Sequence, residues 1–177
     1  MLFCVLAVLL HATLSYSENV STWGSLKGVT SISGVIVGTP GKGLTAVGVG
    51  RRRILDIIYQ GFRFNGIETK APYPESPVLF ADVLTKGVVN GDIEFEVEFS
   101  LMTETNFPSV KTENKTKWNP NIPVGVWTYY SKTKITSAEM SAKDATEATA
   151  AIRDSIYHSV GNAASRLISD MKRDNPK

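Results

Sequence analysis

The stretch DIEFEVEFSL, residues 92–101, alternates apolar and polar side chains from end to end. Successive side chains of a β-strand point to opposite faces, so this alternation predicts a strand with one buried face and one acidic face. It is the clearest structural signal in the chain, and its apolar side requires a covering layer. The predicted buried face consists of Ile93, Phe95, Val97, Phe99 and Leu101.

The preceding residues, 79–88, form the predicted partner strand of a hairpin. A two-residue turn at Asn90-Gly91 would set Lys86 opposite Phe95 on the buried face. A three-residue loop that also includes Val89 satisfies both faces, and it is the predicted connection. In that register Ala81 lies opposite Phe99, Val83 opposite Val97, Thr85 opposite Phe95, and Lys86 opposite Glu94.

Two further stretches, residues 23–38 and 124–136, predict strands because both are rich in β-branched residues. The second separates into two faces, with Trp127, Tyr129 and Ile135 on one and Lys132 and Lys134 on the other.

Residues 44–64 allow two interpretations. Thr45 can cap a helix that ends at Asn65-Gly66 in a left-handed cap. Alternatively, Asn65-Gly66 is the turn of a hairpin between two strands. The helix is favoured because the segment is long for a strand. Its positions at spacings of three and four are Val47, Arg51, Ile54, Ile58 and Phe62.

A long helix is predicted over residues 137–172, because apolar side chains recur there every three or four positions. Lys172 and Arg173 at its end are favourable to the helix dipole. Unbroken, it would be about 50 Å long, more than a domain of this size covers. A break or kink is therefore expected at Gly161-Asn162, or else the N-terminal third projects.

Together these elements predict a single α+β domain over residues 18–177. We expect a mostly antiparallel sheet of four to five strands, with one face covered by a helix near residues 44–64 and by the long C-terminal helix. The polar segment 104–123 is predicted to be a long loop, and such loops in compact domains are usually functional or mobile.

The start of the chain predicts a secretory signal over residues 1–17. Residues 2–10 form an apolar run too short to span a bilayer, and Ser15 and Ser17 suit a signal-peptidase site before Glu18. The alternative is a buried N-terminal strand or helix. The remaining residues offer no transmembrane segment.

The residues left after cleavage include no cysteine, which favours a bacterial periplasm or exterior over a disulfide-forming secretory route. The sequons at Asn19 and Asn114 would be glycosylated only in a eukaryotic route, so both sources stay open.

Composition argues against nucleic-acid binding and catalysis. The 177 residues carry 19 basic and 17 acidic side chains, and a net charge of +2 gives no basic surface for phosphates. With Cys4 and His11 in the signal, His158 is the last histidine, which excludes the common zinc sites and Cys-His nucleophiles. A hydrolase centred on His158 is the remaining alternative, although Asp154 beside it is explained by an ordinary helix pair. We expect no enzyme activity, cofactor or metal.

The candidate functional residues are therefore ones expected to bind a partner or ligand. Arg51, Arg52 and Arg53 form the densest basic cluster, suited to an anionic lipid or carbohydrate and to peripheral membrane contact. Trp118 lies in the predicted loop. Either this loop or a sheet edge is expected to contact an envelope or secreted protein, or a second copy of the chain. In the alternative, a secreted glycoprotein holds a lipophilic ligand between sheet and helices, lined by Phe95, Phe99 and Trp127.

Short motifs along the chain resemble a group of exported bacterial α+β proteins of similar length. They are Leu26-Lys27-Gly28-Val29, Gly43-Leu44-Thr45, Asn65-Gly66-Ile67-Glu68, residues 83–87, Val126-Trp127-Thr128 and the ending Asp174-Asn175-Pro176-Lys177. In layout the chain is also similar to the small envelope domains of the TolB N-terminal and LptE-like kind. Glycines 48 and 50 and the three arginines depart from this pattern. The resemblance implies an envelope or periplasmic setting with binding or assembly work, and it implies no catalytic residue.

Overall fold

The computed structural model describes residues 19–69, 76–89, 92–105, 122–137, 141 and 143–176. The predicted signal, the sequon at Asn114 and Trp118 lie outside the described residues. In chain order the elements are β1 (Asn19–Gly24), β2 (Gly34–Val37), α1 (Lys42–Ala46), α2 (Arg51–Phe64), β3 (Val78–Val89), β4 (Asp92–Thr105), β5 (Ile122–Ile135) and α4 (Ala145–Asp174).

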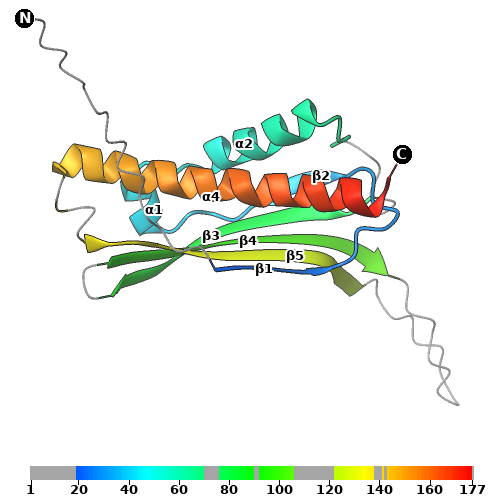
Figure 1. Ribbon diagram of the computed structural model, residues 1–177, viewed down its shortest axis with the longest axis horizontal. Coiled ribbons are helices and arrows are strands. Elements are labelled where there is room, and N and C mark those ends of the chain that lie inside the picture. The colour runs from blue at the N-terminus through cyan, green and yellow to red at the C-terminus, as the bar shows by residue number, and fades with distance from the viewer. Residues whose placement is uncertain are drawn as a thin grey trace, which may run out of the picture.

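Five strands form one sheet in the order β1-β5-β4-β3-β2, and α2 and α4 lie over one of its faces (Figure 1). Neighbouring strands are antiparallel except β2 and β3, which are parallel. The predicted α+β class and mostly antiparallel sheet are therefore confirmed. Residues 23–38, predicted as one strand, instead supply parts of both edge strands, because the chain leaves β1 at Gly24, where φ is +107°.

The β3–β4 hairpin has the predicted pairing on its buried face, with Ala81 opposite Phe99 and Thr85 opposite Phe95. The predicted three-residue connection is wrong, because the strands pair as far as Val89 with Asp92. A β-bulge between Thr85 and Gly87 takes up the extra residue, so that Lys86 has no partner directly opposite.

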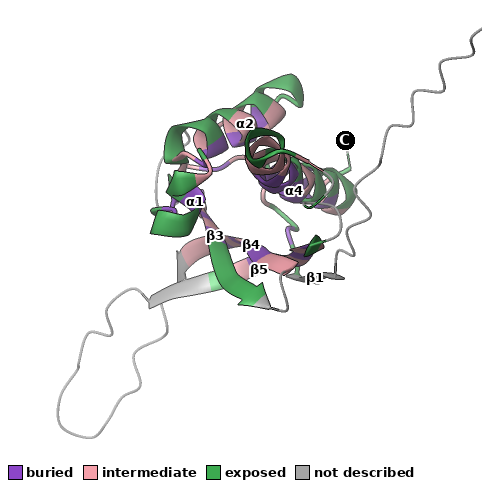
Figure 2. Cartoon of the chain, turned by 90° about the vertical axis from the view of Figure 1, so that its left-hand side faces the viewer, coloured by how far each residue is buried: buried purple, intermediate pink, exposed green. Residues whose placement is uncertain are grey.

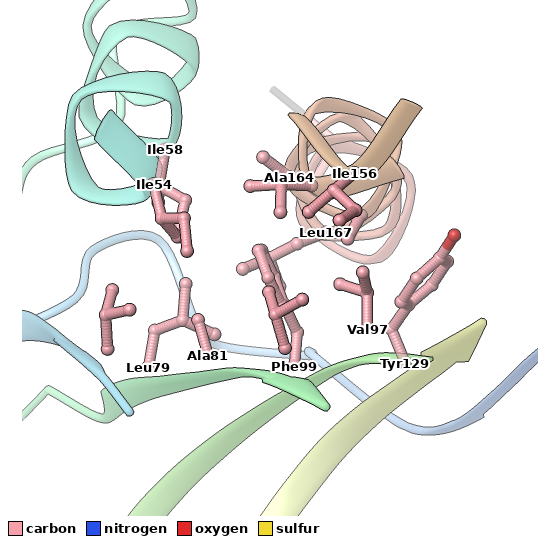
Figure 3. Packing of buried hydrophobic residues seen from close by; sticks show 14 of the residues in the cluster. Ile54, Ile58, Leu79, Ala81, Val97, Phe99, Tyr129, Ile156, Ala164 and Leu167 are labelled. Carbon is pink, nitrogen blue, oxygen red and sulfur yellow. The ribbon is translucent and has the colours of Figure 1, made fainter. Parts of the chain in front are cut away.

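The core fills the space between the sheet and the two long helices. Figure 3 shows Ile54 and Ile58 of α2 and Leu167 of α4 facing the side chains of the central strands. The side chains of β3, β4 and β5 alternate as the sequence predicts, so one face is apolar and buried. Its fully buried members include Leu79, Ala81, Phe95, Val97, Phe99 and Leu101.

The segment predicted as one helix over residues 44–64 is helical but divided. Helix α1 ends at Ala46, and α2 begins at Arg51 with Gly50, not Thr45, as its N-cap. The division lies at Gly48, whose φ of +81° is unfavourable for residues with a side chain. The end of α2 is as predicted, because Gly66 is left-handed and the amide of Ile67 donates to the carbonyl of Phe62 in a Schellman cap.

Helix α4 runs through Gly161-Asn162 without interruption, so the predicted break there is wrong. Its 30 residues span about 45 Å at 1.5 Å each. It begins later than predicted, at Ala145, and the carboxylate of its N-cap residue Asp144 accepts a hydrogen bond from the amide of Glu147 at 2.8 Å. Gly161 faces Ile57 of α2, and Gly61 of α2 faces Ile168, so the two glycines permit close helix packing.

Candidate functional site

An apolar cavity of about 230 Å³ opens at one end of the two-layer structure. It lies between α1, the hairpin end of β3 and β4, and the first half of α4, and Figure 2 views the molecule from that end. Among the described lining residues Thr85 alone has a polar side chain, so the cavity favours an apolar group. The lining residues are Gly43, Leu44, Val47, Thr85, Gly87, Val88, Ile93, Phe95, Ile152 and Ile156.

Two of the residues that line the cavity on the side of α1 and β3 are glycines, which leave space because they have no side chain. A methyl group added to Gly43 would meet nothing within 4 Å outside its own helix. Gly87, at the bulge of β3, has a φ of +112° and also leaves open space beside it. The opposite wall is apolar and belongs to the main core, because Phe95 and Ile156 are fully buried.

An apolar side chain is also exposed at the mouth of the cavity. Val88, which lines the cavity, is 68% exposed. Leu84 is 47% exposed but lies opposite Glu96 on the outer face of the sheet, away from the cavity. Val88 thereby extends the apolar surface of the cavity to the solvent.

The opposite end of α4 is closed by hydrogen bonds to the segment after β1. The carboxylate of Asp174 accepts from the amide of Leu26 at 2.9 Å. The side-chain nitrogen of Asn175 donates to the carbonyls of Leu26 and Met171 at 2.8 and 2.9 Å, and its oxygen accepts from the amide of Gly28. These contacts fix the last turn of α4 over the sheet.

A buried carboxylate also holds the C-terminal end of α4 to the sheet. Asp170 is 3% exposed and accepts hydrogen bonds from the indole nitrogen of Trp127, from Arg166 and from Arg173, at 3.1, 3.1 and 2.8 Å. It thereby joins α4 to β5, and its charge is compensated by two guanidinium groups of its own helix.

Ion pairs cross the outer face of the sheet, away from the helices. Lys86 contacts Glu96 at 2.8 Å, and the hydroxyl of Tyr130 also donates to Glu96. Burial raises the pKa of Glu96, but the bonds from Lys86 and Tyr130 outweigh it and hold that pKa below its ordinary value. The same bond, together with burial, raises the pKa of Tyr130 to about 12.

Two more ion pairs follow toward the hairpin end of the sheet. Lys132 contacts Glu94 at 2.7 Å, and Lys134 contacts Asp92 at 2.6 Å. The hydrogen bond from Lys134, with one from the amide of Ser137, lowers the pKa of Asp92.

The residues predicted from the sequence to contact a partner or ligand lie in different parts of the structure. Arg51, Arg52 and Arg53 are exposed on the first turn of α2 and form no ion pair with any described residue. Phe95 lines the cavity. Phe99 and Trp127 are buried in the packed core and do not line it, because they lie farther along the sheet from the hairpin.

His158 and Asp154, considered for a hydrolase, are both exposed on α4. Asp154 pairs with its neighbour Arg153 at 3.2 Å. Within the described ranges, no three His, Cys, Asp or Glu side chains lie close enough to hold a metal ion. Among the helices that the structure describes, none combines the length and apolar character needed to cross a membrane.

Sequence reasoning missed most of the cavity. The sequence pattern places Leu44 and Val47 in a continuous helix over residues 44–64, and Ile152 and Ile156 in the apolar stripe of the C-terminal helix. The available signal was Gly48, whose positive φ separates α1 from α2.

Comparisons with known proteins assign no family to this chain. No protein-family model matches the sequence, and no curated protein does. A solved structure, the dodecamer of a PelC point variant from Paraburkholderia phytofirmans, aligns at 14% identity with a TM-score of 0.40, covering 89% of this chain and 96% of that one. A second PelC dodecamer structure from the same organism gives 16% identity and a TM-score of 0.38, over 78% and 94% of the two chains. Similarity at this level supports no statement about activity or assembly.

Proposed function

We propose that this chain is an exported, non-enzymatic binding protein that receives one large apolar side chain of a partner protein in the cavity beside α1. The observation that carries the proposal is the cavity itself, which is apolar, open and lined in part by the exposed side chain of Val88. Its volume of about 230 Å³ exceeds the roughly 150 Å³ cavity that binds benzene. It is smaller than the roughly 300–1,000 Å³ pockets that enclose whole small molecules.

A pocket of this size suits the anchor residue of a protein interface. Anchors are typically aromatic or large aliphatic side chains that enter a desolvated pocket. Full burial of one such side chain contributes about 1.5–3 kcal/mol, so a partner must supply further contacts around the mouth to bind tightly.

The alternative, a carrier of a whole lipophilic ligand, receives less support. Of the three residues predicted to line such a site, only Phe95 reaches the cavity. Phe99 and Trp127 are buried in the packed core and are not among the lining residues of the cavity.

Export rests on the sequence of residues 1–17, and it has its own test. Expressed in a secreting host, the protein recovered outside the cytoplasm should begin near Glu18 by intact-mass measurement. Recovery only from the cytoplasm with residues 1–17 intact would contradict export without affecting the cavity.

Binding is tested by methyl NMR with indole as the analogue of a tryptophan side chain. Indole should shift the methyl signals of Leu44, Val47, Ile152 and Ile156 saturably, whereas decanoate should bind more weakly because the cavity cannot enclose its chain. The substitution Gly43→Leu fills the cavity and should weaken indole binding at least tenfold.

Gly41→Leu is the matched control, because Gly41 also has open space around it but does not line the cavity. It should leave indole binding unchanged. Equal binding by the Gly43→Leu protein, or no saturable shift in the unsubstituted protein, would refute the proposed function. Tighter binding of decanoate than of indole would favour the carrier instead.

A further inference from the structure

The edge of the sheet beside the cavity is only half covered. Strand β2 pairs with β3 over Val78–Ala81, and the amide of Gly38 extends this pairing with a bond to the carbonyl of Ala81 at 3.0 Å. From Asp82 to Val89, β3 pairs with β4 on one side, and no strand within the described ranges pairs with it on the other.

The free edge offers backbone hydrogen-bonding groups. Amide and carbonyl groups of a strand point alternately to its two sides, and the carbonyl of Ala81 points to the β2 side. The same groups of Val83 and Thr85 therefore point to the side that β2 leaves open. Residues 84–88 are all exposed, so a peptide can approach this edge from solvent.

The cavity lies directly beside this edge. Thr85, Gly87 and Val88 of β3 line it, together with residues of α1. A strand added next to β3 would continue the plane of the sheet, and its inward side chains would lie beside Val83 and Thr85. One of them would therefore enter the cavity.

The outer face of the same edge carries uncompensated negative charge. Asp82 lies directly opposite Glu98 on β4, an arrangement that is unfavourable for like charges. Within the described residues neither carboxylate forms an ion pair, whereas Glu94 and Glu96 each contact a lysine. Gly38 lies directly beside Asp82, so an outward basic side chain on the added strand, at the position beside Leu84, would reach Asp82 diagonally.

We infer that an extended segment of the partner protein binds as an additional strand along the free edge of β3. It places one large apolar side chain in the cavity and presents Lys or Arg to Asp82. The inference rests on the proposed function, and it adds the mode of binding and the sequence pattern of the partner, in which basic and apolar residues alternate.

The probe is the acetylated hexapeptide amide Lys-Val-Lys-Phe-Lys-Val, compared with a version methylated on alternate backbone nitrogens. Methylation of the nitrogens that face β3 blocks strand pairing but leaves every side chain intact. Titrations followed by ¹⁵N NMR should show at least tenfold weaker binding of the methylated peptide. Hydrogen exchange of the Val83 and Thr85 amides should slow when the unmethylated peptide is bound.

A charge exchange tests the contact with Asp82. The peptide Glu-Val-Glu-Phe-Glu-Val should bind the natural chain at least fivefold more weakly than the lysine peptide. Asp82→Lys, which also relieves the repulsion from Glu98, should reverse that preference. An equal preference in both proteins would overturn the role of Asp82.

The outcomes separate this inference from the proposed function. If indole enters the cavity but the methylated and unmethylated peptides bind equally, strand addition is wrong and the cavity proposal stands. If indole also fails to bind, the proposed function is wrong as well. If the amides of Val83 and Thr85 are protected in the peptide-free protein only at concentrations where it self-associates, the occupant is a second copy of the chain, and the partner assignment is overturned.

Discussion

Helix α4 crosses the whole sheet, and its two ends meet the strands in different ways. At the C-terminal end, the clamped end, Asp170, Asp174 and Asn175 bond to β5 and to the segment after β1. At the N-terminal end, the open end, Ile152 and Ile156 face a cavity and a half-covered strand edge.

The difference shows how one fold can be stable and still have space to bind a side chain of a partner. Polar bonds with a buried carboxylate fix the helix at the clamped end, where a defect would leave buried groups unsatisfied. At the open end the contacts are apolar and incomplete, so an incoming side chain adds contacts without displacing any.

The largest expected effect comes from truncating one core residue at each end. Leu167→Ala, in the packed part, should lower the free energy of unfolding by about 3–4 kcal/mol, because the side chain is fully buried. Ile152→Ala should cost about 2 kcal/mol, because its side chain already borders open space. Urea denaturation measures both, and equal losses would remove the contrast between the two ends.

The second prediction concerns the carboxylates of α4. Asp170→Ala should cost about 2 kcal/mol, since it leaves the buried indole nitrogen of Trp127 without an acceptor. Asp154→Ala, nearer the open end, should change stability by less than about 0.5 kcal/mol because its pair with Arg153 is exposed. A loss at Asp154 as large as that at Asp170 would show that the open end is also held by polar bonds.

A smaller gain is expected from closing the cavity. Gly43→Leu should raise the free energy of unfolding by about 1 kcal/mol, because leucine favours the helix and buries apolar area. Gly41→Leu, at the N-cap position of α1, should change it by less than half as much. Thermal unfolding of the two proteins provides the measurement, and destabilisation by Gly43→Leu would mean that the space is not available.

The smallest effect is a pH dependence. The pKa of Tyr130 is raised to about 12, so its bond to Glu96 contributes stability below pH 10 that is lost as the pH rises toward 12. Tyr130→Phe should therefore reduce the loss of stability between pH 10 and 12. Part of the loss should remain in this variant, because the pKa of Lys134 is also raised, by Asp92. Denaturation midpoints over this range test the point, and an unchanged alkaline slope would contradict it.

The two ends should behave alike in acid. The pKa of Asp92 at the open end is lowered mainly by Lys134, and the pKa of Asp174 at the clamped end mainly by Arg173. Each group contributes stability above its ordinary pKa, and that contribution is lost as the pH falls through the lowered value.

The sequence predicted the sheet better than the ends of the helices. Alternation in residues 92–101 determined both the strand and its buried face, because a one-residue slip would expose every apolar side chain. The break predicted at Gly161 failed because one glycine costs only about 1 kcal/mol in a helix, and packing against Ile57 accommodates it.

The candidate site was less accessible to sequence reasoning. Its lining comes from α1, β3, β4 and α4, so it depends on where these elements meet. Phe95 was identified because it belongs to the clear alternating pattern. The bond between Trp127 and Asp170 joins residues 43 positions apart, and no local pattern indicates it.

The most direct test of the central claim is a crystal structure of the protein soaked with 4-bromobenzyl alcohol, with the bromine located by anomalous scattering. We expect one strong bromine peak among Leu44, Val47, Phe95 and Ile156, with the clamped end unchanged. A peak at the clamped end, or no peak in the cavity at a ligand concentration that saturates other apolar cavities of this size, would contradict it.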